Sequence, residues 1–135
     1  LVAEDSSEFY VEIEGAYKFE DCSEFVKVNV LPQLYGGEWA WDFGMAQYKL
    51  AKFLATFNEA LEICSDAPDW DWELFCDLAY VDGRWPSNVS NSPVNLIELY
   101  NQKADHIEAG ETPELPHHAL LDARLLSDYY AKYIK

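Results

Sequence analysis

The chain has 135 residues, half of them hydrophobic and 16% aromatic, which is enough to bury a core as one globular domain. Its 25 acidic residues against nine Lys and Arg give a net charge of −16, which excludes the broad basic surface that proteins use to hold long nucleic acids. No apolar run approaches the ~20 residues that span a bilayer, and no basic leader with an apolar core opens the chain. We therefore expect a single cytoplasmic domain over residues 1–135 that does not bind membranes.

The three cysteines, Cys22, Cys64 and Cys76, are widely spaced and include no Cys-x-x-Cys pair. This spacing favours free thiols in a reducing compartment over a disulfide framework or a zinc site.

The start of the chain predicts a hairpin followed by a short helix. Residues 1–15 read as two arms, and the second arm alternates apolar and polar side chains as a strand with one solvated face does. The first arm has hardly begun at Leu1, so we expect the opening of its strand to be missing. Asp21 or Ser23 could cap a helix over residues 24–30, which the following Leu-Pro would end.

The middle of the chain predicts two helices separated by a short strand. Residues 45–60 form an amphipathic helix, 61–65 are apolar enough for a buried strand, and 71–80 form the next helix. Residues 94–100 suggest a strand or an irregular segment, and 102–116 a polar loop. The apolar sides of the two helices are expected to hold Leu50, Phe53, Leu54, Phe57, Leu74, Phe75, Leu78 and Ala79. Strands that precede helices, with one strand passing directly into a helix, predict a mixed α+β or α/β sheet.

The last segment, Pro116-His-His-Ala-Leu-Leu-Asp, predicts an amphipathic helix from Ala119 onward with a carboxylate on its buried stripe. That carboxylate, Asp122, needs an ion pair, hydrogen bonds or a metal to offset its burial. On a regular helix His117 would point about 140° away from Asp122. A histidine at the start of the helix is not held to that geometry and can reach the same pocket.

The segment PHHALLDARLLSDYY resembles the third motif of the DEDDh 3′-5′ exonucleases, a family of the ribonuclease H-like superfamily. The resemblance implies that His117 is the general base and Asp122 a metal ligand. It gives no role to His118, which we expect to be an exposed neighbour, or to His106, which has no motif around it.

Residues 70–75, Trp-Asp-Trp-Glu-Leu-Phe, follow the predicted strand and open a helix, and they look like the second motif of the same family. The resemblance makes Asp71 a metal ligand, and Asp66 and Asp69 remain alternatives. A carboxylate in the first turn of a helix also stabilises the helix without any metal. The tryptophans at 70 and 72 could stack on bases, although packing at the start of the helix explains them as well.

Nearly the whole chain resembles, in order, the branch of this family that contains the mycobacterial 3′-5′ exoribonucleases. The matching stretches are Leu-Val-Ala-Glu-Asp at 1–5, Glu-Phe-Tyr at 8–10, Asp-Cys-Ser-Glu-Phe-Val at 21–26 and Val-Leu-Pro at 30–32. The implied fold is α/β, a ribonuclease H-like mixed sheet flanked by helices, with its first central strand largely missing from this chain. The family's Asp-x-Glu pair would lie before Leu1. A similar acid-x-acid pattern occurs at Glu12-Ile-Glu14, but it aligns with the second strand instead.

The resemblance implies a metal-dependent 3′-5′ exonuclease that shortens RNA, or possibly DNA, with two Mg²⁺ or Mn²⁺ ions as cofactors. Its ligand would be a short single-stranded or 3′-overhanging nucleic acid. We expect Asp71 and Asp122 to lie near one another with His117 at the rim of their cleft, and an unpaired sheet edge to favour a homodimer. The alternative is a catalytically inactive ribonuclease H-like binding or scaffold domain without the first metal-binding motif.

Overall fold

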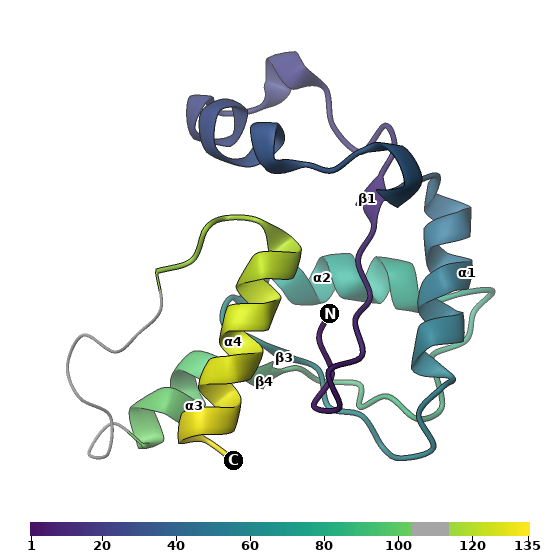
Figure 1. The fold of residues 1–135 in the computed structure, drawn as a ribbon. Coiled ribbons are helices and arrows are strands. Elements are labelled where there is room, and N and C mark those ends of the chain that lie inside the picture. The colour runs from purple at the N-terminus through teal and green to yellow at the C-terminus, as the bar shows by residue number, and fades with distance from the viewer. Residues whose placement is uncertain (104–113) are drawn as a thin grey trace. The chain divides into compact units, whose positions relative to one another are not determined.

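Short parallel strands and separate helices make up residues 1–103 and 114–135, the part of the chain that the computed structural model describes. The chain divides into two units, Leu1–Phe43 with Ala109–Lys135, and Gly44–Glu108. Each unit contains a two-stranded parallel sheet, so the architecture is mixed α/β (Figure 1). Most of the loop predicted over 102–116 lies outside the described residues.

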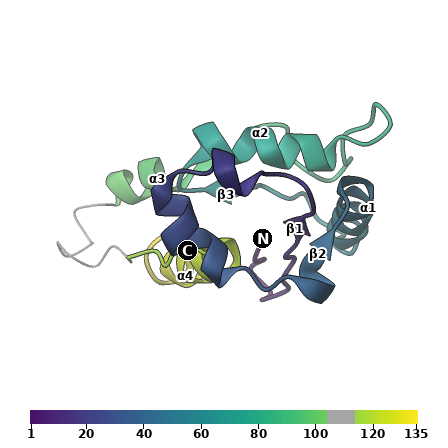
Figure 2. The ribbon, with the colours of Figure 1, turned by 90° about the horizontal axis from the view of Figure 1, so that it is seen from above.

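The first unit opens with the predicted hairpin, held by hydrogen bonds between its two arms. The Leu1 ammonium donates to the Phe9 carbonyl at 2.7 Å, the Phe9 N–H donates to the Leu1 carbonyl at 3.0 Å, and Val2 and Glu8 form an antiparallel bridge. The second arm is regular over only two residues, β1 (Glu12–Ile13), because its ladder partner is the equally short β2 (Ala40–Trp41). The pair is parallel and is visible in Figure 2.

Helical turns connect these two strands, and one of them lies within the range 24–30 predicted as a helix. They are the 3₁₀ turns η1 (Phe19–Asp21), η3 (Leu31–Gln33) and η4 (Gly37–Trp39), and the π-helix η2 (Val26–Val30). Ser23 provides the cap, because its hydroxyl accepts a hydrogen bond from the Val26 N–H at 3.3 Å. The turn at Gly36 has a φ of 61°, which glycine adopts without steric cost.

The first unit ends in α4 (Ala119–Tyr133), which begins at the residue where the sequence predicts it (Figure 1). Leu120 and Tyr129 are its buried hydrophobic side chains, at 5% and 6% exposure. Asp122, the carboxylate on the predicted stripe, is half-buried.

The second unit opens with α1 (Phe43–Leu54), which ends six residues before the end of the helix predicted over 45–60. The chain turns there because the Asn88 amide donates to the carbonyls of Leu54 and Phe57, at 2.9 and 3.2 Å. The Leu54 carbonyl also accepts a hydrogen bond from the Phe57 N–H at 3.3 Å. The local turn and a side chain far along the chain therefore hold the end of this helix together.

Strands and helices alternate in the rest of the second unit. β3 (Cys64–Ser65) pairs in parallel with β4 (Val94–Asn95), and a parallel bridge joins Leu61 to Val89. Between the two strands lies α2 (Pro68–Ala79), which begins before the predicted helix over 71–80 because proline suits the first helical turn.

The strand or irregular segment predicted over 94–100 is mostly α3 (Leu96–Gln102). Asn95 caps this helix, because its side-chain oxygen accepts hydrogen bonds from the N–H groups of Ile97 and Glu98 at 3.0 and 3.3 Å. The apolar residues that suggested a strand therefore lie mostly on a helix.

The buried hydrophobic residues of the second unit come from its helices and from the segment before β4. They are Ala46, Leu50, Leu54, Phe75, Ala79, Val89, Leu96 and Tyr100. Leu50 and Leu54 are almost fully buried, and each contributes about 1.5–3 kcal/mol by leaving water. Among the described residues, no helix has both the length and the apolar character needed to cross a membrane.

Candidate functional site

The start of α4 holds His117 in an unusual backbone conformation. His117 has a φ of 62°, in the left-handed region that a non-glycine residue adopts only where its surroundings impose it, and its side chain is exposed. The imidazole meets the Phe25 ring edge to face, with ring centroids 5.0 Å apart. The peptide before it is also fixed, because the Gln33 amide donates to the Pro116 carbonyl at 2.7 Å. An exposed imidazole on a fixed backbone is suited to exchange protons with a bound ligand.

His118 is buried at 3% exposure, so the prediction of an exposed neighbour is wrong. Its ring stacks on the Tyr10 ring at a centroid distance of 5.2 Å and lies 4.6 Å from the Tyr35 ring. Its Nδ1 accepts a hydrogen bond from the Leu121 N–H at 3.4 Å, which assigns the ring proton to Nε2. Nε2 in turn lies 3.3 Å from the Tyr10 hydroxyl. Burial of the His118 imidazole is favourable because the rings of Tyr10 and Tyr35 cover it and the Leu121 N–H donates a hydrogen bond to its Nδ1.

Asp122 takes part in the same helix cap. One of its carboxylate oxygens accepts a hydrogen bond from the His118 N–H at 3.3 Å, while the His118 ring caps a backbone N–H within the first turn. This exchange resembles a capping box, in which two side chains satisfy each other's backbone donors. Hydrogen bonding and the positive end of the helix dipole thus explain the half-buried carboxylate without a metal.

A second carboxylate in the first unit, that of Glu12, is held by three hydrogen bonds. It accepts from the Tyr10 hydroxyl at 2.6 Å and from the N–H groups of Tyr35 and Gly36 at 2.6 and 2.9 Å. Burial raises the pKa of the Glu12 carboxyl, but the three hydrogen bonds together lower it by more, so the pKa lies below its ordinary value. Burial also raises the pKa of Tyr10 well above its ordinary range, and the neighbouring carboxylate raises it further.

Together these contacts form a chain of side chains, which we call the His118 relay: His118, Tyr10 and Glu12. The imidazole lies against the tyrosine hydroxyl, and that hydroxyl donates to the carboxylate. Sequence reasoning missed this cluster. The second histidine of the His-His pair was its only local signal, because the residues involved lie more than a hundred positions apart.

Asp71 lies in the second unit, in the first turn of α2, the helix that comes next in the chain after β3. Its side chain is exposed and accepts a hydrogen bond from the hydroxyl of buried Ser65 at 2.5 Å, and the same hydroxyl accepts from the Ala67 N–H at 2.9 Å. This network fixes the strand-to-helix turn. Of the two alternatives, Asp66 is half-buried between β3 and α2, and Asp69 is exposed in the first turn of the helix.

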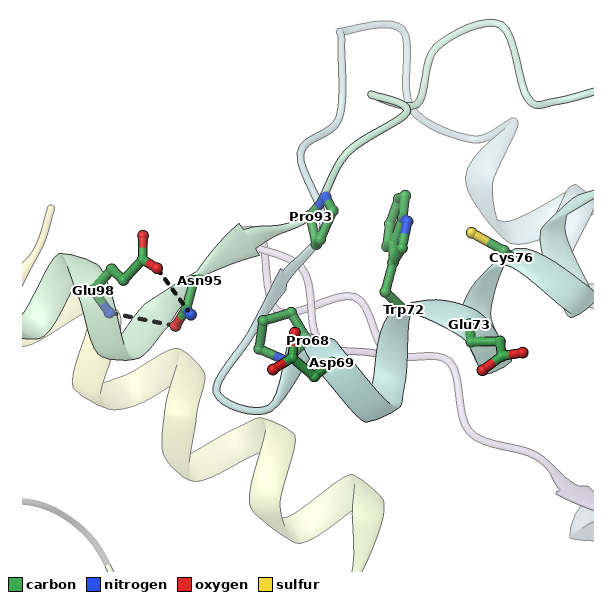
Figure 3. Close-up of a pocket in the computed structure, with 8 residues that line it drawn as sticks. All are labelled: Pro68, Asp69, Trp72, Glu73, Cys76, Pro93, Asn95 and Glu98. Atoms are coloured by element: carbon green, nitrogen blue, oxygen red, sulfur yellow. Dashed lines mark hydrogen bonds between the residues drawn. The ribbon is translucent and has the colours of Figure 1, made fainter.

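A pocket of about 690 Å³ lies beside α2 in the second unit (Figure 3). It is lined by Pro68, Asp69, Trp72, Glu73, Cys76, Pro93, Asn95 and Glu98. Three of these residues are acidic and none is basic, so the pocket repels phosphate groups. Asp69, one of the two alternatives to Asp71, lines the pocket, whereas Asp71 itself does not.

The cysteine in this pocket is not an activated nucleophile. Burial raises the pKa of the Cys76 thiol, and the negative charges of Asp77 and Glu73 raise it further. A reactive cysteine needs the opposite change, because the thiolate is the nucleophilic form.

The predicted site residues therefore fall into both units: His117 and Asp122 in the first, Asp71 in the second. Residues 1–103 and 114–135 contain no group of three or more His, Cys, Asp or Glu side chains that could hold a metal ion. Glu12 and Glu14, which have the same spacing as the Asp-x-Glu pair, do not form such a group either. Two-metal phosphodiester cleavage needs several converging carboxylates, so Asp71 and Asp122 would need further carboxylates beside them to hold two ions.

No family model matches the chain, and no curated protein matches it.

Proposed function

We propose that this chain belongs to a DEDDh-type 3′-5′ exonuclease domain of ribonuclease H-like fold, acting on short single-stranded or 3′-overhanging RNA. The observation that carries the proposal is the start of α4. There His117 is exposed on a left-handed backbone, within the segment that resembles the family's third motif. A neutral imidazole in this position can accept the proton of a water molecule that attacks a phosphodiester.

The metal ions remain part of the proposal as cofactors, with Asp71 and Asp122 as their ligands in this chain. Both carboxylates lie in the first turn of a helix, and the helix that holds Asp71 comes next in the chain after β3. The proposal requires further carboxylates, normally an Asp-x-Glu pair, to complete the centre. When bound, two Mg²⁺ or Mn²⁺ ions would supply charge stabilisation to the phosphodiester.

A second candidate is a ribonuclease H-like binding or scaffold domain that does not cleave. The observation in its favour is that both proposed ligands already have structural partners. Asp122 closes the cap of α4, and Asp71 accepts a hydrogen bond from Ser65. Its weakness is that it gives the exposed His117 no task.

The test is digestion of a 3′-labelled and a 5′-labelled single-stranded oligoribonucleotide in the presence of Mn²⁺ or Mg²⁺. We expect shortening from the 3′ end that a chelator abolishes. Removal of the general base in His117→Ala should lower the rate by about 10²–10⁴-fold. Asp122→Asn should also abolish cleavage, whereas Asp128→Asn, the same change at an exposed position of α4, should not.

Two results would contradict the exonuclease. One is cleavage that His117→Ala leaves unchanged, and the other is wild-type protein that binds the oligonucleotide without shortening it. The second result would make the binding domain the better description. Melting with and without Mn²⁺ separates the candidates independently, since ions bound by the folded protein raise its melting temperature. Light scattering of the same sample tests the predicted homodimer.

A further inference from the structure

Contacts on both sides of His117 support its left-handed backbone conformation. Such a conformation is uncommon at a non-glycine residue, although histidine adopts it more readily than most. Two anchors flank the residue: the Gln33 amide holds the Pro116 carbonyl before it, and the buried His118 ring lies directly after it. The His117 side chain itself is exposed and touches the Phe25 ring. Its direction is therefore set largely by what fixes His118.

We infer that His118 is a positioning residue, which holds the His117 ring at the Phe25 edge and so presents it to the substrate. The catalytic meaning of this inference rests on the proposed function. The geometric part, in which one histidine orients the other, does not depend on it.

Packing fixes the His118 ring from two sides. The Tyr10 ring stacks on it, with an angle of 25° between the ring planes, and the Tyr35 ring lies against it at 39°. Tyr10 is held in turn by its hydrogen bond to Glu12, and Glu12 by the backbone of the turn at Gly36. The His118 relay thus ties the start of α4 to the strand and turn of the same unit.

Hydrogen bonds fix the His118 backbone and the cap of the helix. Nδ1 accepts from the Leu121 N–H, and the backbone N–H of His118 donates to Asp122. The peptide bond between His117 and His118 is therefore anchored on its C-terminal side by a ring and two hydrogen bonds. Loss of the ring removes both the packing and one cap, and His117 is then free to return to a negative φ.

Three variants separate packing from capping. His118→Ala removes both. His118→Asn keeps an acceptor for the first turn of the helix, because asparagine is among the best N-caps, but it removes the ring from between Tyr10 and Tyr35. Asp128→Asn is the control, because Asp128 lies on the exposed side of α4 and its replacement alters neither the packing nor the cap of the helix.

The first measurement is NMR of the wild type and the three variants, with melting temperatures recorded on the same samples. We expect nuclear Overhauser effects between the His117 and Phe25 rings in the wild type and in Asp128→Asn. They should be lost in His118→Ala and in His118→Asn, even though the asparagine restores the part of the melting temperature that the cap contributes. Ring contacts that persist in His118→Ala would overturn the inference. So would asparagine restoring the contacts together with the stability, because His118 would then be only a helix cap.

The second measurement is single-strand digestion kinetics under the conditions of the nuclease test. His118→Asn should lower kcat by about 10²-fold with little change in KM, because a misdirected general base slows the chemical step and leaves binding intact. An unchanged kcat in a variant that has lost the ring contacts would also overturn the inference. A wild type without nuclease activity would refute the proposed function and the catalytic role of His118. The NMR result would still decide whether His118 orients His117.

Discussion

The carboxylate of Glu12 offers a sharp test of how the first unit is held together. We expect Glu12→Gln to destabilise the protein, because the substitution keeps the size of the side chain but removes its charge. The wild-type carboxylate accepts hydrogen bonds from Tyr10, Tyr35 and Gly36. The glutamine still offers an oxygen to some of these donors, but without a negative charge.

The size of the effect follows from the three bonds. A hydrogen bond to a charged group contributes about 1.5–3 kcal/mol and a neutral one about 0.5–1.5 kcal/mol, so full loss of charge assistance would cost about 3 kcal/mol. Glu12 is only half-buried, and water compensates part of this loss. We therefore expect a decrease of about 1–2 kcal/mol in the free energy of unfolding at pH 7. For a chain of this length that lowers Tm by about 3–10 °C.

The effect of Glu12→Gln on stability should also depend on pH. The pKa of Glu12 is lowered in the folded protein, so its charge stabilises the fold above the unfolded-state pKa of about 4.3. That stabilisation is lost as the pH falls through the lower, folded-state pKa. The difference in Tm between wild type and Glu12→Gln should therefore be largest near pH 7 and should shrink toward pH 3.

Glu14→Gln is the matched control, because Glu14 is exposed two residues away and its replacement removes the same charge. In a chain with a net charge of −16, loss of an exposed acid should leave Tm unchanged or raise it slightly. Thermal melts by circular dichroism at several pH values give all of these quantities. Equal melting temperatures for the two variants across the pH range would refute this account of Glu12.

Three further predictions concern other contacts. Arg124→Lys should lower Tm slightly at low salt and not at all in ~1 M NaCl, because the bidentate pair with Glu8 is exposed and screened; salt-dependent melting measures this. Asn88→Ala should cost about 1–3 kcal/mol in urea unfolding, because the carbonyls of Leu54 and Phe57 lose the hydrogen bonds that its amide donates, whereas exposed Asn91→Ala should change little. Leu50→Ala should cost about 2–5 kcal/mol in the same assay with an unchanged m-value, because Leu50 is 1% exposed.

Local sequence signals predict the elements of this fold better than their ends. The caps at Ser23 and Asn95 and the start of α4 depend on side chains within a few residues, and such signals are legible in a sequence. The sequence predicts the cap at Ser23 and the start of α4. It does not predict the helix after Asn95, because the apolar residues that follow Asn95 also fit a strand. The end of α1 could not be predicted in this way, since it depends in part on Asn88, far along the chain. Where a distant side chain satisfies a backbone group, periodicity alone places the boundary wrongly.

The same distinction applies to the candidate site. A motif gives the identity of His117 and Asp122 because their spacing is local, but it treats the residue between His117 and Ala119 as a variable position. In the structure that residue, His118, is buried and contacts partners such as Tyr10 that are more than a hundred residues away. A residue that reacts can be inferred from a short pattern of chemical groups. A residue that holds it in place is defined by the fold, and here it becomes visible only when the two ends of the chain are brought together.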